Sequence, residues 1–246
     1  MIFSLEVIGF NFESCVAAQA AGAHRIELCD NPGDGGTTPS YGFIKAAREI
    51  LSIELYPIVR PRGGDFLYSA AEFEIMKADV QLCKELGCDG VVIGMLQADG
   101  SVDKQRCKQL VDIAYPLGVT FHRAFDRVSD PFKALEDIIE TGCERILTSG
   151  QKPTAGEGAE MIKALIEQAD DRIIIMPGSG VRSGNILDVA TETGATEFHT
   201  SARVLTESKM KFINPEMNEA LVLVAADEDE VRKMIEILQQ LKVADE

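Results

Sequence analysis

The chain has 246 residues, of which 46% are hydrophobic and 26% charged, a composition typical of folded globular proteins and unlike that of disordered ones. Its 40 acidic residues outnumber the 24 basic ones, and the formal net charge of −16 disfavours nucleic acid and anionic membranes as partners. The six cysteines include no CxxC pair, the first residues lack the pattern of a signal peptide, and no apolar run is long enough to span a membrane. We therefore expect a cytoplasmic protein with reduced thiols that binds neither nucleic acid nor a membrane.

A pattern of glycine, a small residue and then an apolar strand recurs four times along the chain. Each glycine follows a helix-like run, at the position where glycine commonly ends a helix; the four are Gly22, Gly87, Gly142 and Gly194. Further strands are expected before and between these repeats, at residues 4–8, 55–60, 119–122 and 173–176. The pattern predicts eight strands that alternate with helices, which is typical of a parallel sheet.

Eight strand–helix units in about 200 residues indicate a closed (βα)8 TIM barrel. The alternative is an open doubly wound sheet, which needs a G-x-G-x-x-G turn after the first strand; residues 9–12 read GFNF and do not supply one. We predict a single domain, with the barrel in residues 1–205 and a C-terminal extension, residues 206–246, packed on it. Apolar residues at helical spacing predict an amphipathic closing helix over residues 228–242.

Helices are expected over residues 13–21, 70–86, 131–141 and 185–193, and two helix starts carry capping signals. Thr38 before Pro39 predicts an N-cap followed by proline in the first turn. Ser69 followed three residues later by Glu72 has the pattern of a capping box.

Alternation along the strands predicts an unusually polar barrel interior. The polar side of each strand should face inward, because the surrounding helices need apolar partners. The titratable side chains that would converge there are Glu6, Glu27, Arg60, His122 and His199. Buried charges need partners, so we expect Arg60 to lie between Glu6 and Glu27 and to form an ion pair. Because imidazole titrates near neutrality, His122 is the candidate general acid or base, with Glu27 orienting it or carrying the proton itself.

The loops that follow the strands add groups suited to an anionic ligand. Glycine-rich loops let backbone N–H groups approach a ligand, and the loops after strands 7 and 8 of TIM barrels commonly bind phosphate. The predicted anion site consists of Arg62, Arg123, Ser179, Gly180 and Ser201. The predicted catalytic set consists of Glu27, Arg60, His122, Asp126 and His199. This pattern favours an enzyme that acts on a small anionic metabolite, for example a phosphorylated one, without a nucleotide cofactor.

Longer strings resemble the CutC family: RIELC at 25–29, GGTTPS at 35–40, RPRGGDF at 60–66, TFHRAFD at 120–126, LTSGQ at 147–151 and EFHTSAR at 197–203. The resemblance implies a cytoplasmic TIM-barrel protein that forms dimers or tetramers, takes part in copper homeostasis and binds Cu(I) through cysteine. Cys29 is the inward-facing thiol beside the polar cluster and thus the candidate metal ligand. Ile8 stands where some family members carry a second cysteine. Two functions therefore stay open, copper handling through Cys29 and catalysis through the polar pocket.

Overall fold

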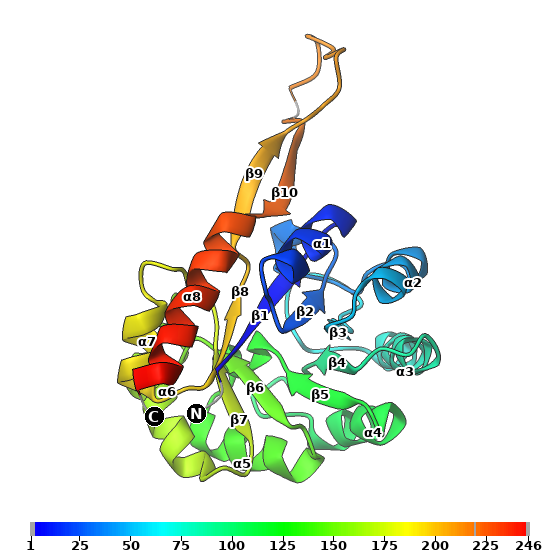
Figure 1. The fold of residues 1–246 in the computed structure, drawn as a ribbon. Helices are drawn as coiled ribbons and strands as arrows, with labels where there is room; N and C mark the ends of the chain where they lie inside the picture. The colour runs from blue at the N-terminus through cyan, green and yellow to red at the C-terminus, as the bar shows by residue number, and fades with distance from the viewer. Residues whose placement is uncertain (1–2, 219, 245–246) are drawn as a thin grey trace.

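Eight parallel strands form a ring inside a layer of helices in the computed structural model, which describes residues 3–218 and 220–244 (Figure 1). The strands are β1 (Ser4–Gly9), β2 (Arg25–Leu28), β3 (Glu54–Pro57), β4 (Gly90–Ile93), β5 (Gly118–Phe121), β6 (Arg145–Thr148), β7 (Ile174–Pro177) and β8 (Glu197–Thr200). All eight predicted strands are present, with small shifts at their ends.

The ring consists of two hydrogen-bonded groups of strands, in the orders β3-β2-β1-β8 and β4-β5-β6-β7. A bridge between Ile58 and Val92 joins the end of β3 to β4, and β7 lies against β8. The predicted TIM barrel is therefore confirmed, and the chain does not form an open doubly wound sheet.

Seven helices connect the strands in the described part of the barrel: α1 (Phe12–Ala20), α2 (Tyr41–Ile50), α3 (Ala70–Glu85), α4 (Lys104–Ala114), α5 (Pro131–Thr141), α6 (Ala159–Ala169) and α7 (Ile186–Thr193). Two short 3-10 helices, η1 (Pro32–Asp34) and η2 (Arg123–Arg127), lie in loops at the carboxyl ends of strands. The capping box at Ser69 and Glu72 is confirmed.

The start of α2 differs from the prediction at Thr38. The helix begins at Tyr41, and its cap is Ser40, whose hydroxyl accepts a hydrogen bond from the N–H of Phe43 at 3.2 Å. The hydroxyl of Thr38 accepts from the backbone N–H of Arg60 at 2.9 Å, and its own N–H donates to the Arg60 carbonyl at 2.9 Å. Thr38 therefore holds the chain after β3 in place and is not available as a helix cap.

The extension after β8 begins with an arm that projects from the barrel (Figure 1). The arm consists of residues 203–218 and 220–226 and contains the antiparallel strands β9 (Arg203–Glu207) and β10 (Val222–Ala226). Helix α8 (Glu228–Ala244) then returns to the barrel and buries the apolar face that begins at Val231, which confirms the predicted closing helix. None of the helices in the described ranges is long and apolar enough to cross a membrane.

Candidate functional site

A layer of buried ion pairs lies deep inside the barrel. Arg25 on β2 donates to Glu6 on β1 at 2.5 Å and to Glu197 on β8 at 2.7 Å. Arg145 on β6 donates to the same Glu197 at 2.6 Å. The partner of Glu6 is therefore Arg25, and the prediction that Arg60 would pair with it is wrong.

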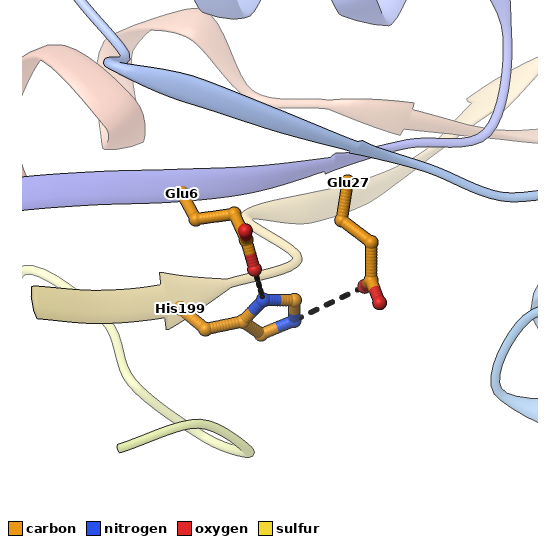
Figure 2. A group of neighbouring side chains, drawn as sticks. All are labelled: Glu6, Glu27 and His199. Atoms are coloured by element: carbon orange, nitrogen blue, oxygen red, sulfur yellow. Dashed lines mark hydrogen bonds and ion pairs between the residues drawn. The ribbon is translucent and has the colours of Figure 1, made fainter. Parts of the chain in front are cut away.

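Glu6, His199 and Glu27 form a line of buried side chains next to this layer (Figure 2). Nδ1 of His199 lies 2.6 Å from Oε1 of Glu6, and Nε2 of His199 lies 3.8 Å from Oε2 of Glu27. Strand β1 lies between β8 and β2, and its register pairs Glu6 with His199. The strand pairing itself therefore brings these groups together.

The three groups differ in the protonation that their surroundings favour. Burial opposes the charge of Glu6, but Arg25 and the hydrogen bond with His199 outweigh it and lower the pKa of Glu6 to about 2. Burial raises the pKa of Glu27 to about 7, although His199 opposes the shift. Burial alone would lower the pKa of His199, yet Glu6 and Glu27 raise it. Glu6 is thus ionised, Glu27 gains and loses its proton near neutral pH, and the two carboxyl groups favour the charged form of His199.

The same three side chains also have the residue types of a metal site. One ligating atom from each can be chosen so that all lie within 4.8 Å of one another. However, Oε1 of Glu6 already shares a hydrogen with Nδ1 of His199, and its Oε2 accepts from Arg25. A cation bound through either oxygen of Glu6 would therefore compete with one of these two contacts.

A cavity of about 190 Å³ lies where Glu27 and His199 face the carboxyl ends of the strands. Its polar lining comes from strand ends and loops around the ring: Glu27, Arg60, His122, Arg123, Ser179, Ser201, His199 and Arg203. Gly180 and Phe66 also line it. A wider hollow of about 700 Å³ adjoins this cavity and shares Arg60, Phe66 and Arg123 with it.

Arg60 reaches the cavity from a loop and not from β3. The strand ends at Pro57, so the alternation that places inward side chains no longer applies at residue 60. Its guanidinium donates to the carbonyls of Asp34 and Gly36, both at 2.7 Å, and to that of Gly64 at 2.9 Å. It has no carboxylate partner among the residues that the structure describes, so the predicted ion pair with Glu27 does not form.

Arg123 is held at the edge of the cavity by Asp126 and Ser149. Its Nε donates to Asp126 at 2.7 Å, and its Nη2 donates to the hydroxyl of Ser149 at 2.8 Å. Asp126 also accepts from the hydroxyl of Thr148 at 2.6 Å and lines only the wider hollow. Asp126 therefore positions Arg123 and the loop after β6.

Arg62 lies apart from the other predicted anion-binding residues. Its guanidinium donates to Glu72 at 2.5 Å and to Asp65 at 2.9 Å, and it lines neither the cavity nor the adjoining hollow. The structure thus brings Arg123, Ser179, Gly180 and Ser201 to the cavity and leaves Arg62 outside it.

His122 caps the 3-10 helix η2 after β5. Its Nδ1 accepts the N–H of Ala124 at 3.1 Å, so the neutral ring carries its hydrogen on Nε2. Burial, together with the charge of Arg60, lowers the pKa of His122 to about 3. The imidazole is therefore neutral near pH 7, and the group that titrates there is Glu27 rather than His122.

Cys29 is fully buried after the end of β2, and all six cysteines are free thiols. It packs with Tyr56, Ile58 and Val92 behind the lining of the cavity. Burial raises its pKa well above the usual value, and the carboxyl groups of Glu27 and Glu6 raise it further. The protein thus favours the neutral thiol at this position.

The sequence profile of the CutC family matches residues 3–204. The chain belongs to the CutC family. A protein of Chromobacterium violaceum named as a CutC family protein is 55% identical over 208 residues, which cover 85% of this chain and 84% of that protein. The human copper homeostasis protein cutC homolog is 50% identical over 212 residues, which cover 86% of this chain and 78% of that protein. The match confirms the family that the sequence strings resemble.

Solved structures agree with the fold. A CutC protein from Streptococcus agalactiae is 36% identical, with a TM-score of 0.78, over 81% of this chain and 99% of that chain. Phosphoribosyl anthranilate isomerase from Thermotoga maritima has a TM-score of 0.62 at 13% identity, over 98% of this chain and 100% of that chain, which supports the fold alone. The family match ends at residue 204, so nearly all of the arm and the whole of α8 lie beyond it.

Proposed function

We propose that this CutC family member is an enzyme that binds a small anionic metabolite in the cavity and transfers a proton on it. The observation that supports this most strongly is the state of Glu27. Its carboxyl group faces the cavity with a pKa of about 7 and is linked through His199 to the ionised Glu6. A general acid or base works best when its pKa is close to the working pH.

The charges around the cavity favour an anionic ligand. Arg60, Arg123 and Arg203 line it, although the chain as a whole carries a net charge of −16. Guanidinium groups form paired hydrogen bonds with phosphate and carboxylate oxygens. The side chain of Arg123 is 42% exposed and is held in one orientation by Asp126, so it is available to an incoming anion.

Binding of phosphorylated compounds tests this proposal. The probes are inorganic phosphate and a panel of phosphate esters of three- to six-carbon hydroxy aldehydes and ketones, measured by isothermal titration calorimetry. We expect at least one ester to bind and Arg123→Gln to weaken that binding about tenfold. Arg62→Gln is the matched control, because Arg62 lies in the loop after β3 and outside the cavity. The affinity of this variant for the ester should equal that of the unmodified protein. Failure of every ester to bind, or equal losses in both variants, would contradict the proposal.

Cu(I) binding at Cys29 is a second candidate. The name of the human relative supports it, as does the place of Cys29 beside Glu27 at the end of β2. Because the surroundings favour the neutral thiol, uptake would release a proton and strengthen as the pH rises. The test is anaerobic titration with Cu(I) against a competing chelator, for the reduced protein and for Cys29→Ser. Loss of one bound Cu(I) in the variant supports the site, and equal binding by both proteins removes it.

We also propose that the chain forms homo-oligomers through the arm and works in the cytoplasm. Nine large apolar side chains of the arm are exposed by 40–72%: Val204, Leu205, Met210, Phe212, Ile213, Met217, Leu221, Val222 and Leu223. Exposed apolar side chains that gather on one element are typical of protein–protein interfaces. The sequence from residue 203 to residue 226 contains three basic and three acidic residues, so it has no net charge of its own to oppose contact between two arms. The six free thiols fit a reducing compartment.

Sedimentation measurements test the proposed contact between arms. Leu205 and Leu223 lie on opposite faces of the β9–β10 ribbon, because Leu205 pairs with Val224 and Leu223 pairs with Thr206. We expect the double variant Leu205→Glu, Leu223→Glu to sediment as a monomer, while the unmodified chain sediments as a dimer or tetramer. A monomeric unmodified chain, or an oligomeric variant, would contradict the proposal.

A further inference from the structure

The ring of His122 lines the cavity, and the proton transfer proposed at Glu27 does not use it. The neutral ring of His122 carries a hydrogen on Nε2, which is buried and has no hydrogen-bond partner within the described ranges. A buried donor without a partner costs stability, because it has given up its hydrogen bond to water. Because His122 lines the cavity, an acceptor atom of a ligand is the partner that would offset this cost.

The orientation of the His122 ring is fixed on several sides. Gly94 leaves room for it, since a Cβ at that position would lie 2.4 Å from both Cε1 and Nδ1 of the ring. The hydrogen bond from Ala124 fixes the tautomer, and the ring of Phe66 lies 4.9 Å away between centroids. The guanidinium carbon of Arg60 lies 5.0 Å from the centroid of the same Phe66 ring, so Arg60 adds a positive charge to this wall of the cavity. The donor is thus held in place before any ligand arrives.

His122 and Glu27 come from different halves of the ring of strands. Glu27 is on β2 and His122 directly follows β5, and these strands belong to different halves of the barrel. Both side chains line the same cavity of about 190 Å³. A small ligand in it therefore has a carboxyl group on one side and an N–H donor on the other.

We propose that His122 is a catalytic residue whose Nε2–H binds the carbonyl oxygen of an anionic hydroxy aldehyde or ketone, while Glu27 removes a proton from the adjacent carbon. This inference rests on the proposed function and names the substrate class and reaction type of the same cavity. In the step, the C–H bond breaks and its proton moves to the carboxylate of Glu27. The C–H electron pair forms a C=C bond, and the π pair of the carbonyl moves onto oxygen. That oxygen keeps the hydrogen bond from His122 next to the charge of Arg60.

A neutral imidazole suits this role. An N–H donor placed where negative charge develops stabilises the transition state. In the neutral ring Nδ1 accepts from Ala124, so Nε2–H is the donor left for the ligand. Return of the proton from Glu27 to carbon regenerates a carbonyl compound. The step needs no oxidant, reductant or second substrate.

The protonation of His122 can be measured without a ligand. The chain has three histidines, so ¹⁵N NMR of histidine-labelled protein gives a simple spectrum, and His122→Gln identifies the signals of residue 122. We expect the tautomer protonated at Nε2, with no titration between pH 5 and pH 9. A ring protonated at Nδ1, or a midpoint above pH 5, would overturn the inference.

A pair of probes tests the contact with a carbonyl oxygen. Phosphoglycolohydroxamate has a phosphate and a planar, enolate-like group, whereas 2-hydroxyethyl phosphate has the phosphate without the carbonyl. We expect the unmodified protein to bind the hydroxamate at least tenfold more tightly, His122→Phe to bind both equally, and His122→Gln to keep part of the preference through its amide N–H.

The outcomes separate this inference from the proposed function. Equal binding of the two probes by the unmodified protein, or a preference that survives in His122→Phe, overturns the role of His122 while anion binding stands. If the unmodified protein binds neither probe, the inference is wrong. If it also binds no phosphate ester of the wider panel, the proposed function is wrong as well.

Discussion

Replacing Glu27 with glutamine should make the protein more stable above neutral pH. The native pKa of Glu27 is about 7, against 4.5 for an ordinary glutamate, because the side chain is buried. Because the native pKa is raised, the neutral carboxyl group of Glu27 contributes to the free energy of unfolding below pH 4.5. This contribution is lost as the pH rises through 7. The shift corresponds to about 3 kcal/mol, at about 1.4 kcal/mol for each pH unit. Glutamine cannot ionise and avoids this loss.

The expected result is that Glu27→Gln exceeds the unmodified protein in free energy of unfolding by about 3 kcal/mol at pH 8.5. The difference should shrink steadily towards pH 5. Urea unfolding at pH 5, 6, 7 and 8.5 gives these free energies, followed by circular dichroism because the chain has no tryptophan.

Glu6→Gln is the matched control, because the same substitution on the neighbouring strand should have the opposite sign. The pKa of Glu6 is lowered to about 2, so its ionised form stabilises the protein above pH 4.5, and this contribution disappears as the pH falls through 2. We expect Glu6→Gln to lose about 3 kcal/mol at pH 7. The raised pKa of Glu27 would be ruled out if the free energy of unfolding of Glu27→Gln changed with pH in the same way as that of the unmodified protein. A Glu27→Gln variant that is less stable than the unmodified protein at pH 8.5 would rule it out as well.

Three further substitutions test the surroundings of the cavity. Arg60→Met removes three hydrogen bonds to loop carbonyls, and we expect it to lose about 3 kcal/mol equally at pH 5 and pH 8; a loss that recovers in acid would show that Arg60 pairs with a carboxylate. Asp126→Asn removes the charge that holds Arg123, and calorimetry should show phosphate-ester binding weakened several-fold; unchanged affinity would mean that Arg123 needs no such support. Gly94→Ala places a methyl group against the His122 ring and should abolish the preference for phosphoglycolohydroxamate; a retained preference would contradict the contact.

The sequence predicts the interior of the barrel well where residues lie on paired strands. Glu6, Glu27 and His199 occupy alternating positions on three neighbouring strands, so one rule places all of them. The same rule also applies to Arg25 and Glu197, each two residues before a predicted inward residue. The alternation thus also marks Arg25 as an inward-facing residue, and it is Arg25, not Arg60, that pairs with Glu6.

Other features of the site depend on loop conformation, which alternation does not describe. Arg60 follows the end of β3 and turns towards loop carbonyls that come from three different positions. The role of His122 depends on one backbone hydrogen bond within η2, which decides which ring nitrogen carries the hydrogen. Arg62 is drawn away from the cavity by Glu72, the residue that also completes the capping box of α3.

The proposed chemistry needs a carboxyl group that gains and loses a proton near neutral pH, so the titration of Glu27 is the measurement that decides it. ¹³C NMR of glutamate-labelled protein measures it, with the signal identified by its loss in Glu27→Gln. The structure predicts a midpoint near pH 7 for this carboxyl group. A midpoint near 4.5, the value of an ordinary exposed glutamate, would rule out Glu27 as the group that transfers the proton.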